Sequence, residues 1–259
     1  MEKFIVRSGV NDAGSSDSLE RRLEQFSLEK VAMRSISAPN LRLSYGVVLP
    51  KKLADELYSH CESNIEYNSG ELATVQMFGK TVPIPRRQTA YGDHGLTYTF
   101  SGNTLPANPW PPLMHRLCLL VSDVADVKFN FVLVNRYKDG QDYVGAHRDG
   151  EKDLDRTAPI ASLTLGAARD FVFQHQSARK RKLTDNAAGS ERKLPENVKL
   201  VLEHGSLLLM HPPTNSCWYH SLPGQQIEPT VSTQSTNAAA RSLNYSQIQD
   251  YGQLKYKKT

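Results

Sequence analysis

A series of short strand-like segments in the second half of the chain limits the fold more than any other feature. No helical pattern lies between them, and they occupy residues 129–137, 160–165, 170–175, 198–203 and 206–210. Short strands that follow one another without intervening helices are typical of an all-β barrel or sandwich. The sequence therefore predicts that the core of the domain is built from strands.

Two helices and further strands are expected before this region. Partial alternation predicts a strand over 41–49, and Pro50 then opens a helix whose apolar residues Leu53, Leu57 and Tyr58 share one face. Residues 71–105 have a strand-and-turn pattern, and residues 111–124 carry leucines and valines at helical spacing. We thus expect a mainly β fold with flanking helices, in the α+β class.

The composition is typical of a soluble globular protein. A chain of 259 residues with 39% hydrophobic and 22% charged residues is ordinary for one soluble domain with tails. No apolar run approaches the 18 residues or so of a membrane span, so no membrane partner is expected. Three scattered cysteines indicate reduced thiols in the cytosol or nucleus, and a net charge of +4 permits a nucleic-acid partner without requiring one.

One pattern carries metal chemistry. His147 and Asp149 are two positions apart, so they share a face of a strand or tight turn, and His220 follows 71 residues later. Two imidazoles and one carboxylate on one face of a metal form the facial triad of non-haem Fe(II) oxygenases. Taken alone, the pattern also fits a surface turn around Asp149 and a core histidine at 220. A kinase catalytic loop is excluded, since no DFG follows.

The sequence around these residues resembles the AlkB family of Fe(II)- and 2-oxoglutarate-dependent dioxygenases. The motifs are NRYKDG at 135–140, HRD at 147–149 and WYHSLP at 218–223, and the resemblance covers residues 41–223. With TVQMFGK at 74–80 and YGDHGLTYTFSG at 91–102, the chain is similar to the AlkB homologue 2 subgroup, which repairs alkylated double-stranded DNA.

This resemblance implies a double-stranded β-helix, or jelly-roll, core and a complete set of reactants. His147, Asp149 and His220 would bind Fe(II), while Asn135 and Tyr137 would hydrogen-bond 2-oxoglutarate, which reacts with O2. The implied reaction removes the methyl group of 1-methyladenine or 3-methylcytosine as formaldehyde and converts 2-oxoglutarate to succinate and CO2.

The same resemblance implies a nucleotide-recognition lid at about 66–105. A base must leave the duplex before it can be oxidised. The hairpin Met77-Phe78-Gly79 would insert Phe78 into the base stack, and the lid aromatics Tyr98 and Phe100 would stack on the flipped base. Outside the lid, Glu151 matches an acidic residue that contacts the base. Its neighbour Gly150 departs from the family pattern, which often has aspartate there.

The C-terminal region departs further from the family. Members continue after the last histidine into a strand of the form R-x-N-L-T-x-R, whose first arginine clamps 2-oxoglutarate. Here the nearest match is RSLNYSQ at 241–247, so Arg241 is the candidate clamp. Residues 224–259 are polar and poor in aliphatic residues, so no strand is expected there. Either the tail loops out and Arg241 still reaches the site, or, as we favour, the C-terminus has been replaced. The alternatives to an active enzyme on DNA are therefore an inactive DNA- or clamp-binding module and, more weakly, an RNA demethylase.

The first 40 residues are expected to form a disordered arm, with a short helix within 18–34. Near its start, Lys3-Phe4-Ile5-Val6-Arg7 fits a short pattern by which some repair proteins bind the replication sliding clamp. Arg86, Arg87 and the basic cluster 179–182 are candidate contacts to DNA phosphates. A nuclear monomer is the expected form of the protein.

Overall fold

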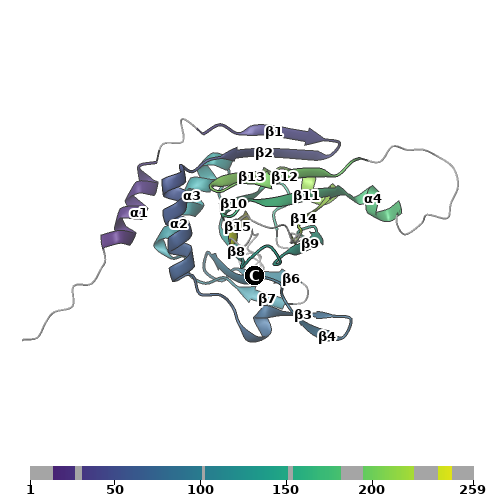
Figure 1. Cartoon of the computed structure of the whole chain (residues 1–259), viewed down its shortest axis with the longest axis horizontal. Helices are drawn as coiled ribbons and strands as arrows, with labels where there is room; N and C mark the ends of the chain where they lie inside the picture. The colour runs from purple at the N-terminus through teal and green to yellow at the C-terminus, as the bar shows by residue number, and fades with distance from the viewer. Residues whose placement is uncertain are drawn as a thin grey trace, which may run out of the picture.

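The computed structural model describes residues 14–26, 31–100, 103–150, 154–181, 195–224 and 239–246 (Figure 1). Its centre is a pair of antiparallel sheets that face each other. The larger sheet has the order β1-β2-β13-β10-β15-β8-β5, and the smaller has the order β12-β11-β14-β9. This arrangement agrees with a jelly-roll core, so the predicted mainly β fold with flanking helices is confirmed.

The strands of the larger sheet come from distant parts of the chain. In spatial order they are β1 (Arg34–Ala38), β2 (Leu41–Val47), β13 (Ser206–Met210), β10 (Ile160–Gly166), β15 (Ala240–Ser246), β8 (Phe131–Tyr137) and β5 (Arg87–Gly92). The smaller sheet consists of β12 (Val198–Leu202), β11 (Arg169–His175), β14 (Trp218–Leu222) and β9 (Val144–His147).

Helices cover the outer face of the larger sheet. Figure 1 shows α2 (Lys51–Asn64) and α3 (Pro112–Ala125) beside it, with α1 (Gly14–Glu24) farther out. Leu57 of α2 and Leu117 of α3 are fully buried in the same cluster as Leu163 and Leu243 of the sheet. Burial of these side chains holds the helix layer against the sheet, because each fully buried leucine contributes about 1.5–3 kcal/mol.

The space between the two sheets is apolar over only part of its extent. A second buried cluster there includes Leu41, Phe173, Leu208 and Trp218. The indole nitrogen of Trp218 donates to the carbonyl of Pro39 at 3.1 Å, which ties the smaller sheet to the β1–β2 turn. The remaining space between the sheets forms a cavity.

Strand β15 overturns the prediction that the C-terminal tail lacks a strand. It pairs with β10 over residues 240–245 on one side and with β8 over 240–246 on the other, inside the larger sheet. Its side chains alternate: Leu243 and Tyr245 are buried in the cluster under the helices, whereas Ser242 and Asn244 line the cavity. With only Ala240 and Leu243 as aliphatic residues among seven, this alternation was too weak to predict.

The predicted disordered arm is also partly wrong. Leu19 and Leu23 of α1 are buried in the helix-layer cluster, and β1 pairs with β2. The order therefore begins well before residue 41, because α1 supplies apolar side chains that complete the helix layer. Within the described part of the chain, no helix is both long and apolar enough to cross a membrane.

Two hairpins lie at one side of the sandwich. The first joins β3 (Thr74–Met77) to β4 (Lys80–Pro83), and the second joins β6 (Thr97–Phe100) to β7 (Asn103–Pro106). Phe78 and Gly79 form the two-residue turn of the first hairpin with φ values of 50° and 75°. Positive φ at both positions is what a tight type I′ turn needs, and glycine adopts it readily. The short helices are the 3-10 helix η2 (Gly70–Ala73), α4 (Gln176–Arg181) and α5 (Thr214–Cys217).

Candidate metal and cosubstrate site

Two neighbouring strands bring the predicted metal ligands together. His147 ends β9 and pairs directly with His220 in β14, which accounts for the proximity of two residues 73 positions apart (220 minus 147). Asp149 lies in the turn after β9. Its backbone N–H donates to the Asn215 side chain at 3.0 Å, and the Asn215 amide donates back to the Asp149 carbonyl at 2.8 Å. This pair of hydrogen bonds fixes the turn that carries the carboxylate.

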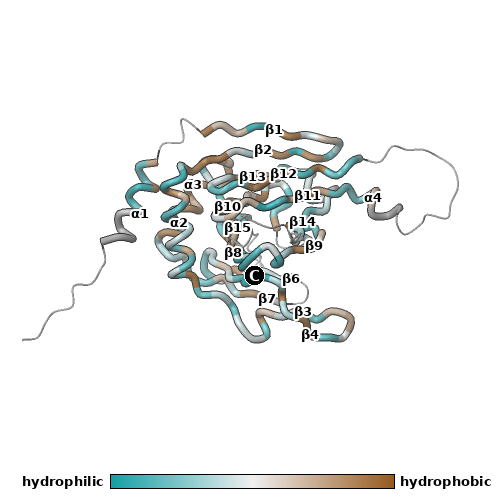
Figure 2. The backbone as a smooth tube through the Cα atoms, viewed as in Figure 1, coloured by the Kyte–Doolittle hydropathy of each residue, from teal (hydrophilic) through white to brown (hydrophobic). Residues whose placement is uncertain are grey.

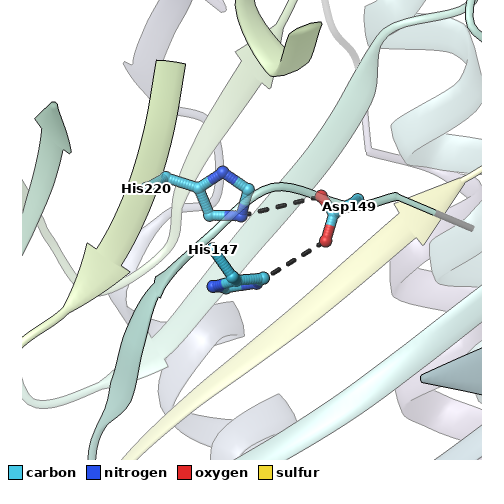
Figure 3. Close-up of side chains that lie close together, drawn as sticks. All are labelled: His147, Asp149 and His220. Atoms are coloured by element: carbon cyan, nitrogen blue, oxygen red, sulfur yellow. Dashed lines mark ion pairs between the residues drawn. The ribbon is translucent and has the colours of Figure 1, made fainter. Parts of the chain in front are cut away.

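The three side chains converge on one point (Figure 3). Each oxygen of Asp149 lies 3.6 Å from the Nε2 atom of one histidine, Oδ1 from His147 and Oδ2 from His220. One ligand atom from each residue falls within 4.8 Å of the others. Among the described residues this is the only such group of three, and its two nitrogens and one oxygen suit Fe(II) with one side left open.

Hydrogen bonding orients the first histidine for metal binding. Its Nδ1 atom lies 2.9 Å from the carbonyl of Gly145, an acceptor, so Nδ1 carries the proton and Nε2 is left as the free lone pair. The Nδ1 atom of His220 is buried and has no hydrogen-bond partner among the described residues. In both rings, Nε2 is the nitrogen that faces Asp149.

The electrostatics of the cluster favour a cation. Burial lowers the pKa of His220 to about 4, which keeps its imidazole neutral and able to donate a lone pair. Burial acts to raise the pKa of Asp149, but the two histidines outweigh it, and the pKa of this carboxyl lies below its usual value. For His147, burial acts to lower the pKa and the neighbouring Asp149 carboxylate raises it above the usual value. An ionised carboxylate between two imidazoles is a ready-made binding site for a divalent cation.

A cavity of about 660 Å³ extends from the cluster between the sheets. Asn135 and Tyr137, the predicted 2-oxoglutarate ligands, line this cavity together with all three metal ligands. They lie two positions apart on β8, so both side chains point to the same face of the sheet. A second cavity, of about 690 Å³, shares His147 and Asp149 and opens toward Tyr219 and Asn215.

Arg241 does not belong to this site, which corrects the prediction that it clamps 2-oxoglutarate. It lies on the helix-covered face of the larger sheet, fully buried, with its Nη2 atom 2.5 Å from Glu62 of α2. Its guanidinium carbon lies 5.5 Å from the ring centre of Tyr58 and 5.7 Å from that of Tyr67. The alternation of a β-strand explains the error, because only every second residue of β15 faces the cavity.

Several cavity residues went unrecognised in the sequence. Ser242 and Asn244 of β15 line the cavity, and so does Arg86, whose Nε donates to the Asn135 side-chain oxygen at 2.8 Å. The sequence places Arg86 only as a candidate phosphate contact. Its position beside the cavity depends on the pairing of β5 with β8, which no local pattern reveals.

The structure places some of the predicted base-contacting residues and leaves others outside its described part. Tyr98 lines the cavity and stacks on Phe131 at a centroid distance of 5.5 Å. Phe78 stands at the tip of the β3–β4 hairpin with 98% of its surface exposed, and Met77 lies beside it and lines the cavity rim. The side chain of Phe100, residue Glu151 and the motif at 3–7 lie outside the described residues. Lys182 also lies outside them, and for Arg179, Lys180 and Arg181 at the end of α4 the structure describes the backbone alone.

Known proteins match the region that forms this site. A family model described as the 2OG-Fe(II) oxygenase superfamily matches residues 45–245. The mouse protein DNA oxidative demethylase ALKBH2 is 45% identical over 225 residues, which cover 86% of this chain and 91% of that protein. Its human counterpart is 50% identical over 190 residues, or 73% of this chain and 70% of that protein. A mouse protein named alpha-ketoglutarate-dependent dioxygenase alkB homolog 3 is 35% identical over 144 residues, or 55% of this chain and 47% of that protein.

Proposed function

The chain belongs to the 2OG-Fe(II) oxygenase superfamily, and from this premise we propose that it is a DNA repair enzyme that demethylates 1-methyladenine and 3-methylcytosine in duplex DNA. The superfamily uses Fe(II), 2-oxoglutarate and O2. When bound, these reactants supply an oxidation in which one oxygen atom enters succinate and the other enters the N-methyl group. The oxidised methyl group leaves as formaldehyde, and the ring nitrogen of the base regains its lone pair.

One observation carries the proposal. His147, Asp149 and His220 converge at a cavity that also contains Asn135 and Tyr137, so metal ligands and cosubstrate ligands share one space. The names of the relatives, DNA oxidative demethylase for the mouse and human proteins, support DNA as the substrate.

The β3–β4 hairpin supports a duplex substrate. Phe78 has 98% of its surface exposed, so its side chain adds no buried apolar area to the fold. Figure 2 shows hydrophobic positions along this hairpin, which projects away from the core. An apolar wedge of this kind can enter a base stack and fill the gap left by a flipped base. Tyr98, stacked on Phe131 beside the cavity, offers an aromatic surface for the flipped base.

Product release by the purified protein tests this proposal. The assay supplies Fe(II), 2-oxoglutarate, ascorbate and a duplex that contains one 1-methyladenine, and it measures succinate, formaldehyde and the repaired base. We expect one formaldehyde per repaired base and no turnover with His147→Ala. A parallel set with 3-methylcytosine, single-stranded DNA and RNA identifies the substrate class, and a preference for RNA would overturn the proposal.

A second candidate is a DNA- or clamp-binding module without turnover. It is favoured by one observation: on β15 the cavity-facing residues are Ser242 and Asn244, and the arginine faces the helices. Under this alternative, the same assay gives no succinate with any methylated substrate, although metal and duplex still bind.

We further propose that the protein acts as a monomer in the nucleus and binds the sliding clamp through the segment at 3–7. The basic-aromatic-aliphatic order of Lys3, Phe4, Ile5, Val6 and Arg7 supports clamp binding. Calorimetric titration of the clamp with a peptide of residues 1–12 tests it. Binding should disappear in a Phe4→Ala peptide, and equal binding by both peptides would exclude the motif.

A further inference from the structure

We infer that Arg86 of this chain, and no residue of β15, binds the distal carboxylate of 2-oxoglutarate. The inference rests on the proposed function, because it assumes that 2-oxoglutarate enters the cavity beside Asn135 and Tyr137. Arg86 lies on the β5 side of β8. The sequence motif suggests instead an arginine in β15, which lies on the other side of β8.

The register of the larger sheet decides which residues flank the cosubstrate ligands. On one side of β8, Ser242 pairs with Asn135 and Ala240 pairs with Tyr137. Neither residue carries a charge, so β15 offers no cation to a carboxylate at this position. A dicarboxylate buried between the sheets without a cation would lose its hydration and gain no ion pair.

The other side of β8 supplies the cation. Gln88 of β5 pairs with Asn135, and Arg86, which directly precedes β5, lines the same cavity as Asn135 and Tyr137. Residues 86 and 88 share a face with 135 and 137, and all four line the cavity. The segment is held in place by the backbone N–H of Tyr143, which donates to the Pro85 carbonyl at 3.1 Å.

The contacts of Arg86 suit a ligand that brings its own negative charge. The side chain is half-buried, its Nε donates to the Asn135 oxygen at 2.8 Å, and it makes no ion pair with an acidic side chain in the described part of the protein. The positive charge of Arg86 also acts on Tyr137. Burial raises the pKa of this tyrosine, and the charge of Arg86 acts in the opposite direction. A guanidinium can bind a carboxylate through two parallel N–H bonds, and the guanidinium of Arg86 is not paired with any acidic side chain of the described residues.

The other buried arginines are engaged elsewhere. Arg148 also lines the cavity, but it stacks on the Tyr219 ring at 4.9 Å and donates to the carbonyl of Ser216. Arg169 is 2% exposed and donates to the carbonyls of Asp139, Asp142 and Pro223. Arg86 is the other described arginine that lines the cavity, and its guanidinium contacts the uncharged side-chain amides of Asn135 and Gln88.

A ligand pair that differs only in the distal carboxylate tests the inference. Protein loaded with Mn(II), which prevents turnover, is titrated with 2-oxoglutarate and with 2-oxopentanoate, in which a methyl group replaces that carboxylate. Binding is measured by calorimetry for the wild type, Arg86→Gln, Arg86→Lys and the neighbouring control Arg87→Gln. Thermal melting of each variant confirms that it is folded, and a fluorescent duplex reports DNA affinity.

Arg86→Gln should weaken 2-oxoglutarate binding about tenfold to a hundredfold and leave 2-oxopentanoate binding unchanged. Arg86→Lys should restore part of the loss, and Arg87→Gln should have no effect on either ligand. Unchanged 2-oxoglutarate affinity in Arg86→Gln, or an equal loss for both ligands, would overturn the inference. If Arg86→Gln weakened only the duplex, Arg86 would be a phosphate contact instead. Should Arg86→Gln lose affinity for 2-oxoglutarate alone while the wild type never repairs DNA, the proposed function would fail and this assignment would stand.

Discussion

Arg241 and Ser242 are neighbours in β15, yet their side chains lie on opposite faces of the larger sheet. Arg241 faces the helices and pairs with Glu62, whereas Ser242 faces the cavity and pairs across the sheet with Asn135 of β8. A one-residue change of register would exchange the two faces. A substitution of Arg241 should therefore change the stability of the domain and not its affinity for 2-oxoglutarate.

Arg241→Ala should destabilise the domain and leave 2-oxoglutarate affinity unchanged. The substitution removes a fully buried guanidinium from between Tyr58 and Tyr67 and leaves a cavity beside Glu62. Glu62 is partly exposed and keeps Arg136 as a partner, so the loss comes mainly from the vacated space and should be about 0.5–3 kcal/mol. Urea unfolding measures the loss, and calorimetry on the folded variant measures ligand affinity. A stable variant with weakened 2-oxoglutarate binding would contradict the orientation of β15.

Glu62 should make the stability of the domain depend on pH. Burial acts to raise the pKa of Glu62, but hydrogen bonds from Arg136 and the charge of Arg241 lower it below the usual value. A depressed folded-state pKa means that the carboxylate stabilises the fold above the unfolded-state value of about 4.3 and loses this effect as pH falls through the folded-state pKa. The difference in unfolding free energy between the wild type and Glu62→Gln should thus be largest near neutral pH and shrink in acid. A difference that grows in acid would refute this reasoning.

Sequence patterns predicted the parts of the fold and site that depend on local spacing. The H-x-D pair, the strand over 129–137 and the helix over 111–124 all follow from side-chain periodicity, and the structure contains each of them. These local patterns do not reveal which strands pair with one another or in which register. The placement of Arg86 beside the cavity and of Arg241 away from it depends on the pairing of β5, β8 and β15, three segments separated by long stretches of chain.

Removal of the metal or its ligands should abolish turnover without unfolding the protein. The three ligands line the cavity and do not belong to the hydrophobic core, and His147 keeps 40% of its side-chain surface exposed. Asp149→Asn keeps the shape of the side chain but removes the charge that attracts the cation, so metal affinity should fall while the melting temperature without metal stays close to that of the wild type. Chelation of the wild type by EDTA should stop succinate release, and added Fe(II) should restore it. Full activity of Asp149→Asn would show that the metal binds elsewhere.

Phe78→Ala should reduce repair of duplex DNA and spare repair of single strands. Because the side chain is almost fully exposed at the tip of the hairpin, its loss should change the unfolding free energy by less than about 0.5 kcal/mol. In a duplex, however, the flipped base leaves a gap that an alanine cannot fill, and the unstacking cost of a few kcal/mol is then uncompensated. Initial rates on matched duplex and single-stranded oligonucleotides measure the difference, with the exposed neighbour Gln76→Ala as the control. Equal rate losses on both substrates would point to a role in base binding or folding and would exclude a wedge.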